Sequence, residues 1–279
     1  MITRSQRINA VAASLCRGDR LPSRYGTATG HGGYSTFGMA SNQILSIIVL
    51  LWLGSLVTAL GEDNKDELRQ RVLAQAQSVS PSDYAFTRTV RSEPTAGGNT
   101  ETTITVDKYD PTKSGDALWT LISVDGAAPS ADALRKYRKE SPQRRIPGYH
   151  RLANYFAGPV TTATDSDGRT LFRFASLPKD SVLVFNSDVS HNTTAEAAVG
   201  EANGVPFVEQ VRLSIKPTRI KLIMKLEQYE STSRFQMGPN GKPVLVEQIA
   251  DVTGSGLGQK GRLHQVITYS DYRAVNRPR

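Results

Sequence analysis

Residues 219–226 read Arg219-Ile220-Lys221-Leu222-Ile223-Met224-Lys225-Leu226. Every second side chain in this stretch is apolar, which is the period of a β-strand with one buried face. The extended pattern continues to Gln236, which is long for one strand, so we expect a bend or a split near Tyr229. A sheet built from such strands must cover its apolar face with other parts of the chain.

Alternation of the same kind recurs on both sides of this stretch. Asn203-Gly204 and Asn240-Gly241 stand between extended runs and predict tight hairpins, because both residue types tolerate positive φ. Helical spacing of apolar residues appears only in three short places, residues 66–77, 131–140 and 149–157. Further strands are predicted at residues 84–91, 100–109, 117–124, 169–176, 182–186, 193–199, 207–215, 243–252 and 262–272.

Short links between neighbouring strands imply antiparallel pairing. The predicted fold class is therefore mainly β (α+β). We expect a curved antiparallel sheet that forms an incomplete barrel, with a few short helices covering the concave face. Residues 62–279 contain no internal repeat and no Pro-rich linker, so they are interpreted as one domain.

An uncharged apolar run of 17 residues from Ile44 to Leu60 predicts export. It is longer than a signal-peptide core and shorter than an ideal membrane span. Small residues near Ala59 and Gly61 favour cleavage, with residues 39–61 as a signal peptide and a periplasmic product. The alternative is an uncleaved inner-membrane signal anchor. Residues 1–38 form a basic Gly- and Ser-rich extension, and either Met1 or Met39 is the true start.

The net charge and the cysteine count change when residues 1–61 are set aside as a leader. The whole chain has 34 Lys and Arg against 26 Asp and Glu, a net charge of +8. Five of the basic residues and one acidic residue lie in residues 1–38, so residues 62–279 carry a net +4. The single cysteine, Cys16, also lies in the leader. Export argues against nucleic acid as a partner.

Residues 62–279 contain no sharp catalytic motif. Gly256-Leu257-Gly258-Gln259-Lys260-Gly261 matches a dinucleotide-binding pattern, but a strand pattern follows it instead of a helix, which favours a hairpin loop. His150, His191 and His264 are far apart in sequence. Carboxylates such as Asp165, Asp167, Asp188 and Glu247 are interpreted as solvated groups, although a hydrolase with a convergent triad stays an alternative.

Three segments carry a resemblance to periplasmic lipoprotein-carrier proteins. Leu68–Val90 is similar to their first helix and strand, Ala195–Val211 to their hairpin, and Lys242–Gln248 with Val266–Tyr272 to the end of the outer-membrane lipoprotein-sorting type. The resemblance implies a half-barrel with helices over an apolar cavity, which carries lipid or acylated cargo without chemistry or cofactor. In the carriers an arginine on an early strand holds the lid. Arg88 and Arg91 both lie on such a strand.

Two sets of candidate site residues follow. The first would line the cargo cavity and consists of Trp119, Leu121, Phe172, Phe174, Phe185, Ile220, Leu222 and Met224. The second is a basic cluster that would bind an anionic headgroup, a membrane surface or an envelope protein, and consists of Arg135, Lys136, Arg138, Lys139, Arg144, Arg145 and Arg151. An ordinary solvated helix face also explains the second set. The alternative function is an exported protein-interaction or envelope-stress-sensing module on the same fold.

Overall fold

The computed structural model describes residues 65–140, 144–184, 186–221, 224–256 and 259–275. The predicted signal segment and both alternative starts lie outside these residues. The chain divides into two compact units, and the one that holds the sheet includes Arg69–Arg279. Of the other unit, Arg20–Leu68, only residues 65–68 are described.

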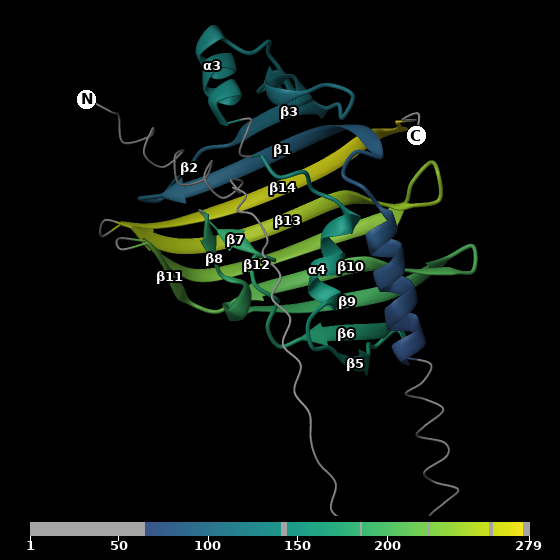
Figure 1. Cartoon of the computed structure of the whole chain (residues 1–279). Helices are drawn as coiled ribbons and strands as arrows, with labels where there is room; N and C mark the ends of the chain where they lie inside the picture. Colours follow the sequence, from purple (N-terminus) through teal and green to yellow (C-terminus); the bar gives the residue numbers. More distant parts are fainter. Residues whose placement is uncertain (1–64, 141–143, 185, 222–223, 257–258, 276–279) are drawn as a thin grey trace, which may run out of the picture. The chain divides into compact units, whose positions relative to one another are not determined.

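One large antiparallel sheet dominates the unit (Figure 1), in the order β4-β3-β1-β14-β13-β12-β10-β9-β6-β5. Two short strands, β2 and β11, pair with β1 and β12 at its margins. Within the described residues β4 and β5 do not pair with each other, so the sheet stays open, as the sequence predicts. The strands are β1 Tyr84–Ala96, β2 Asn99–Thr100, β3 Thr103–Tyr109, β4 Trp119–Val124, β5 Thr161–Thr164, β6 Thr170–Phe174, β9 Thr193–Ala202, β10 Val205–Ile215, β11 Thr218–Lys221, β12 Met224–Met237, β13 Pro243–Gly256 and β14 Gln259–Ala274.

The predicted hairpins form where the turn residues indicate. Asn203 and Gly204, with φ of 53° and 75°, join β9 to β10, and Gly241 with φ of 71° lies between β12 and β13. Gly256 pairs with Gln259 at the turn from β13 to β14. The glycine-rich motif is therefore a hairpin between two strands, and the dinucleotide interpretation fails because no helix follows it.

The long strand predicted over residues 219–236 is wrong in one respect. The chain reverses between β11 and β12, where Lys221 pairs with Met224. From Met224 the strand runs on through Tyr229, so the break lies between Lys221 and Met224 and not near Tyr229. Ile220 and Met224 consequently belong to different strands, and the alternation from 220 to 226 does not follow one strand face.

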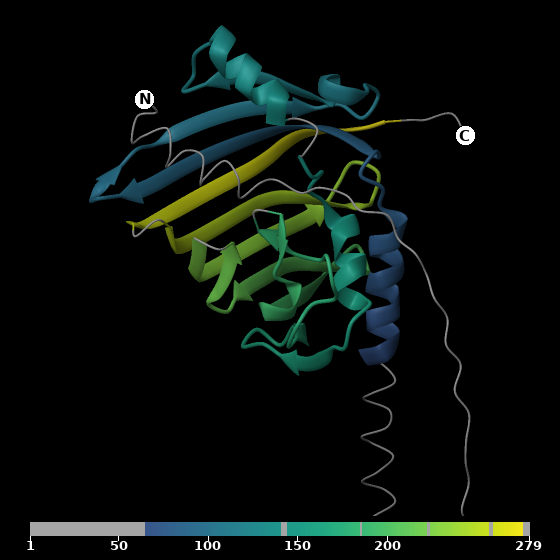
Figure 2. The same ribbon diagram turned by 60° about the vertical axis from the view of Figure 1, so that its left-hand side comes forward.

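The helices are short and few. They are the helix over residues 65–78, α3 Ala131–Glu140 and α4 Leu152–Phe156, with single 3₁₀ turns η1 Gly115–Leu118, η3 Tyr149–Arg151 and η4 Ser190–Asn192. Ser130 caps α3, since its Oγ accepts the Ala133 N–H at 3.2 Å. Figure 2 shows α4 and the helix over residues 65–78 on one face of the curved sheet, and α3 beyond β3 at its margin.

A covering segment closes the concave face over the central strands. It consists of η3, α4 and the hairpin of β7 Leu183–Val184 with β8 Ser187–Asp188. Phe156 of α4 packs edge-on against Phe172 and Phe174 of β6, with ring centroids 5.2 Å apart in both pairs. Arg69 donates hydrogen bonds to the carbonyls of Phe156 (2.9 Å) and Gly158 (3.1 Å), which satisfies carbonyls at the end of α4.

Tyr149 joins the covering segment to the helix over residues 65–78 and to the sheet. Its side chain is fully buried and packs edge-on against Phe235 of β12, at 5.3 Å between ring centroids. Its hydroxyl donates to Gln75 Oε1 and accepts the backbone N–H of Val208, both at 2.9 Å. Val208 lies next to a bulge in the β9–β10 ladder. One side chain therefore links the helix over residues 65–78, the covering segment and the sheet.

Replacing Tyr149 with Phe leaves the buried Val208 N–H and the half-buried Gln75 amide without this partner. We expect the free energy of unfolding, measured by urea denaturation, to fall by about 1–3 kcal/mol. Tyr155→Phe is the matched control, since the Tyr155 hydroxyl makes no hydrogen bond within the described residues, and its effect should stay within about 0.5 kcal/mol. Equal losses in the two variants would contradict the bridging role of Tyr149.

Candidate functional site

A cavity of about 160 Å³ lies between the concave face of the sheet and the covering segment. Its walls come from the sheet on one side and from loop residues, η3, α4 and β7 on the other. The sheet contributes Arg88, Val211, Leu213, Tyr229, Ser233, Phe235, Leu245, Gln248, Ala250, Val252, Leu263, Gln265, Ile267 and Tyr269, and the cover contributes Arg145, Pro147, Gly148, Arg151, Leu152, Tyr155, Val182 and Leu183.

Alternation along the strands explains this floor. Ile267 of β14, Gln248 of β13, Ser233 of β12 and Val211 of β10 are successive cross-strand partners, so they form one row across the concave face. Most neighbours in the floor are aliphatic or aromatic. The floor is therefore largely aliphatic and aromatic, with Arg88 and a few amide and hydroxyl groups as its polar members.

The aromatic and aliphatic residues that the sequence singled out as cavity lining lie elsewhere. Phe172 and Phe174 are buried under Phe156. Trp119 and Leu121 are buried on β4 at the sheet margin. The remaining described members are Ile220, which is buried, and Met224, which is half-buried. None of these six lines the cavity, and Phe185 and Leu222 lie outside the described residues.

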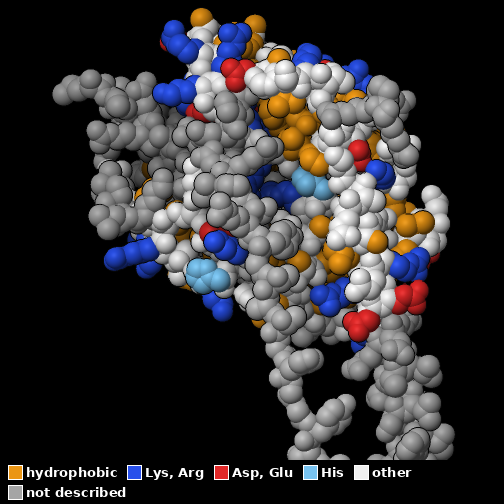
Figure 3. Space-filling view, in the orientation of Figure 1, with side chains coloured by type: hydrophobic (Ala, Val, Ile, Leu, Met, Phe, Trp, Pro, Cys, Tyr) orange, Lys and Arg blue, Asp and Glu red, His pale blue; other side chains and the backbone are white. Residues whose placement is uncertain are grey.

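The basic cluster separates into three places. Arg135, Lys136, Arg138 and Lys139 are exposed on α3, where blue side chains gather in Figure 3. Arg144 stacks on the Tyr137 ring, with 3.4 Å from its guanidinium carbon to the ring centroid. Arg145 and Arg151 line the cavity. Spacing in sequence grouped these seven residues, but only two of them reach the cavity.

A buried polar network borders the cavity near α3. Arg88 pairs with Asp107 through two hydrogen bonds, Nε to Oδ1 at 3.0 Å and Nη2 to Oδ2 at 2.6 Å. The Tyr137 hydroxyl donates to the same carboxylate at 2.7 Å, and Arg88 lies over the Trp119 ring. Burial and the neighbouring Asp107 charge raise the pKa of Tyr137. The network compensates the Arg88 charge and attaches α3 to β3.

The two arginines on β1 point to opposite sides of the sheet. Arg88 lies opposite Tyr269, a cavity residue, whereas Arg91 lies opposite Val266 and pairs with Glu93 at 2.6 Å. Strand alternation places them on different faces because they are three residues apart. Of the two arginines left open by the resemblance, Arg88 is the one beside the cavity.

His150 lies on η3 beside the cavity-lining Arg151. Burial lowers its pKa to about 4, and the Arg151 charge adds to this effect while Asp83 opposes it. Its Nδ1 is buried without a hydrogen-bond partner. His264 contacts Asp251 at 3.1 Å. In the described part of the chain, none of the three histidines hydrogen-bonds to a Ser or Thr hydroxyl.

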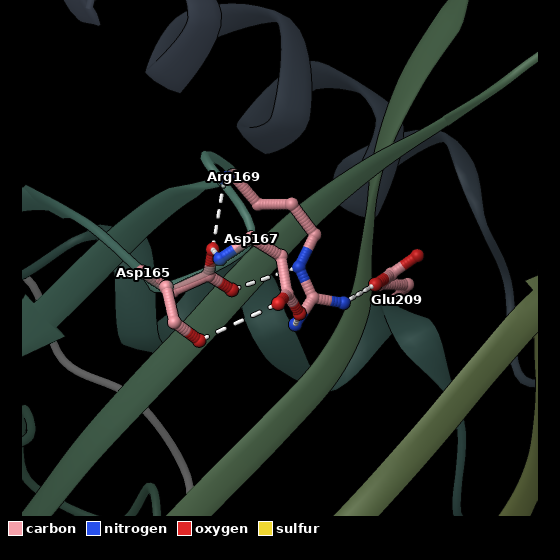
Figure 4. Close-up of polar contacts among 5 residues, drawn as sticks. Asp165, Asp167, Arg169 and Glu209 are labelled. Carbon is pink, nitrogen blue, oxygen red and sulfur yellow. Dashed lines mark hydrogen bonds and ion pairs between the residues drawn. The ribbon is translucent and has the colours of Figure 1, made fainter.

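Two of the candidate carboxylates surround one guanidinium (Figure 4). Arg169 pairs with Asp165 at 2.8 Å, with Asp167 at 3.1 Å and also with Glu209 of β10. Asp165 further accepts the backbone N–H groups of Asp167 and Arg169, both at 2.9 Å. The cluster ties the turn between β5 and β6 to the β9–β10 hairpin, so its role is structural.

A second hollow, about 620 Å³, is more open and is lined largely by polar outer-face groups such as Arg173, Glu196 and Arg212. Arg173 and Glu196 neutralise each other at 2.8 Å. The described residues contain no cluster of three or more His, Cys, Asp or Glu side chains suited to a metal. They also contain no helix with the length and hydropathy of a membrane span.

Comparison with known proteins gives matches of low similarity. No family model and no curated protein matches the sequence. Solved structures that match include a LolA superfamily protein from Nitrosomonas europaea, at 14% identity and a TM-score of 0.28, covering 75% of this chain and 94% of that one. A DUF1329 family protein from Desulfovibrio piger matches at 12% identity and a TM-score of 0.32, covering 75% and 90%. At these TM-scores, function must rest on the chain's own residues.

Replacing Asp107 with Asn removes the charge partner of a buried arginine. We expect a loss of about 3–5 kcal/mol in the free energy of unfolding, because the Arg88 charge would stay buried without compensation. Glu93→Gln is the control, since it breaks the surface pair with Arg91 and should cost less than about 1 kcal/mol. Urea denaturation measures both. A loss of under 1 kcal/mol for Asp107→Asn would argue against the network.

The buried His150 predicts a loss of stability in acid. Below the ordinary imidazole pKa of 6.5 the unfolded chain takes up a proton that folded His150 refuses until about pH 4. Unfolding is thus favoured as the pH falls from 6.5 to 4, by roughly 2–3 kcal/mol from this group at pH 4.5. Comparing urea denaturation at pH 7 and pH 4.5, we expect His150→Gln to show that much less acid sensitivity than the wild type. The exposed His191, changed to Gln, should leave the sensitivity unaltered.

Proposed function

We propose that this protein binds an apolar ligand, a lipid or an acyl chain, in the concave cavity and carries it without chemical change. The observation that supports this proposal is the cavity that the described residues line between the sheet and its cover. Interiors of folded proteins are normally packed to the density of organic crystals. A space of about 160 Å³ with mainly apolar walls is therefore a feature that a ligand would fill.

The volume limits the size of the cargo. An engineered apolar cavity of about 150 Å³ holds one benzene molecule, so the present space suits one chain or the end of one chain. Cargo with several acyl chains, such as a lipoprotein, would require the covering segment to move. We therefore favour a single-chain ligand for the conformation described.

Binding would take its free energy from the same source as core packing, about 25 cal/mol for each Å² of apolar surface removed from water. The cover consists of short elements, which makes its displacement during loading less costly than moving a strand. In this proposal the protein works outside the cytoplasm, after export directed by the apolar run from Ile44 to Leu60. The exposed basic face of α3 would suit an anionic membrane surface as the place of loading.

Filling the cavity tests the proposal. Ala250 lies on the cavity floor, so Ala250→Phe should reduce the affinity for 1-decanol in calorimetric titration by about tenfold or more. It should also lower the amount of lipid that mass spectrometry finds in organic extracts of the purified full chain. Overpacking is expected to cost about 1–3 kcal/mol of stability, so a folded state must be checked by circular dichroism.

The neighbouring residue provides the matched control. Ile249 precedes Ala250 on β13 and points to the other face, between Val266 and Thr232. Ile249→Phe adds a ring outside the cavity and should leave decanol binding unchanged. Undiminished binding by Ala250→Phe, or no decanol binding and no extractable lipid in the wild type, would refute the proposed carrier.

A further inference from the structure

The cavity carries positive charge that the described chain does not neutralise. Arg145 and Arg151 both line it and are half-buried. Among the described residues that line it, none is acidic. Arg151 donates one hydrogen bond to the Ser181 carbonyl at 3.2 Å, and Arg145 makes no hydrogen bond or ion pair within the described residues.

Arg88 lines the same cavity, but its charge is compensated within the fold. It has a bidentate carboxylate partner in Asp107, whose carboxylate is further bound by Tyr137. Buried charges are ordinarily compensated in this way, because an unpaired charge out of water is costly. Arg145 and Arg151 lack such a partner, although they are close enough to repel each other.

The electrostatics of Arg145 agree with that geometry. Burial lowers its pKa, and the Arg151 charge lowers it further, while Asp180, Tyr155 and Asp188 oppose these effects. Asp188 is engaged elsewhere, since its Oδ1 accepts from the Ser190 hydroxyl at 2.5 Å and the Ser190 N–H at 3.0 Å. An anion placed between the two guanidinium groups would remove their repulsion.

The cavity floor is apolar but not uniformly so. Gln265 is buried and donates to Ser92 at 3.0 Å, and Gln248 presents a second amide in the neighbouring strand. A hydrocarbon alone would offer no polar contact to Arg145, to Gln248 or to the remaining donors of Arg151. A molecule with one charged end and one apolar end satisfies both kinds of wall. In Figure 3 basic and histidine side chains lie beside orange apolar ones near the centre of this face.

We propose that the ligand is a single-chain amphiphile with an anionic head, a carboxylate or a phosphate monoester, held by Arg145 and Arg151 with its chain in the cavity. The inference rests on the proposed function, because the chain needs the apolar space. It adds the chemical class of the head and the two residues that select it. Guanidinium groups match both anions through paired N–H donors.

Four ligands that share a decyl chain but differ in their head groups separate the contribution of the head group to binding from that of the chain. Calorimetric titration of the delipidated full chain would compare decanoate, decyl phosphate, 1-decanol and decyltrimethylammonium, each below its micelle concentration. We expect the two anions to bind about tenfold or more tightly than decanol, and the cation most weakly. Acetate and inorganic phosphate supply the heads alone and should not bind measurably.

Substitutions of the two arginines test whether they bind the anionic head. Arg145→Gln and Arg151→Gln should each weaken anion binding about tenfold and weaken decanol binding much less. Arg145→Lys keeps the charge and should retain part of the affinity. Arg91→Gln is the control, because it removes the same charge from the opposite face of β1. Arg145 makes no bond within the described chain, so its variants should fold even if Arg151→Gln does not.

The outcomes distinguish this inference from the function on which it rests. Equal binding of decanol and decanoate, or anion binding that survives both Gln substitutions, overturns the anionic head but leaves the carrier intact. Binding of inorganic phosphate as tight as that of decyl phosphate overturns the amphiphile in favour of a free anion. Failure of all four decyl ligands overturns both proposals.

Discussion

The concave face of one open sheet must be kept from water, and the arrangement of the rest of the unit depends on how it is covered. The central strands offer apolar side chains on that face, but the cover is made only of short elements. A helix as short as α4, Leu152–Phe156, is not stable alone. Its position therefore depends on a few anchors, the Tyr149 hydroxyl, the Phe156 ring and the Arg69 guanidinium.

An incomplete cover explains the cavity and the polar groups around it. Where the fit is complete, as at Phe156 over β6, the sheet and its cover form ordinary core. Where it is not, the space is bordered by arginines of two kinds. Arg88 has a carboxylate within the fold and contributes to structure, whereas Arg145 and Arg151 face the space without one. Arg88 is thus compensated inside the fold, and the proposed anionic head would compensate the other two.

Local patterns in the sequence predicted most of the strands and both Asn-Gly hairpins, because period-two alternation and positive φ are properties of neighbouring residues. They missed β5, Thr161–Thr164, which has no large apolar side chain to alternate. They also placed the break in residues 219–236 at Tyr229, since the sequence between Lys221 and Met224 contains no Gly or Pro. The cavity could not be predicted, because which strand faces remain uncovered depends on η3 and β7, distant in sequence from β12–β14.

The position of the basic cluster in the fold likewise could not be predicted from the sequence alone. Seven basic residues within 17 positions suggested one patch, but Pro142 and Pro147 end the helical pattern, and only Arg145 and Arg151 reach the cavity. The exposed residues of α3 carry charge into solvent, where it is screened and cheap to maintain. The two at the cavity carry charge where solvation is poorer. Keeping two poorly solvated charges costs free energy, and a bound anionic ligand would offset that cost. For the proposed binding, the position of Arg145 and Arg151 beside the cavity therefore matters more than the number of basic residues in the cluster.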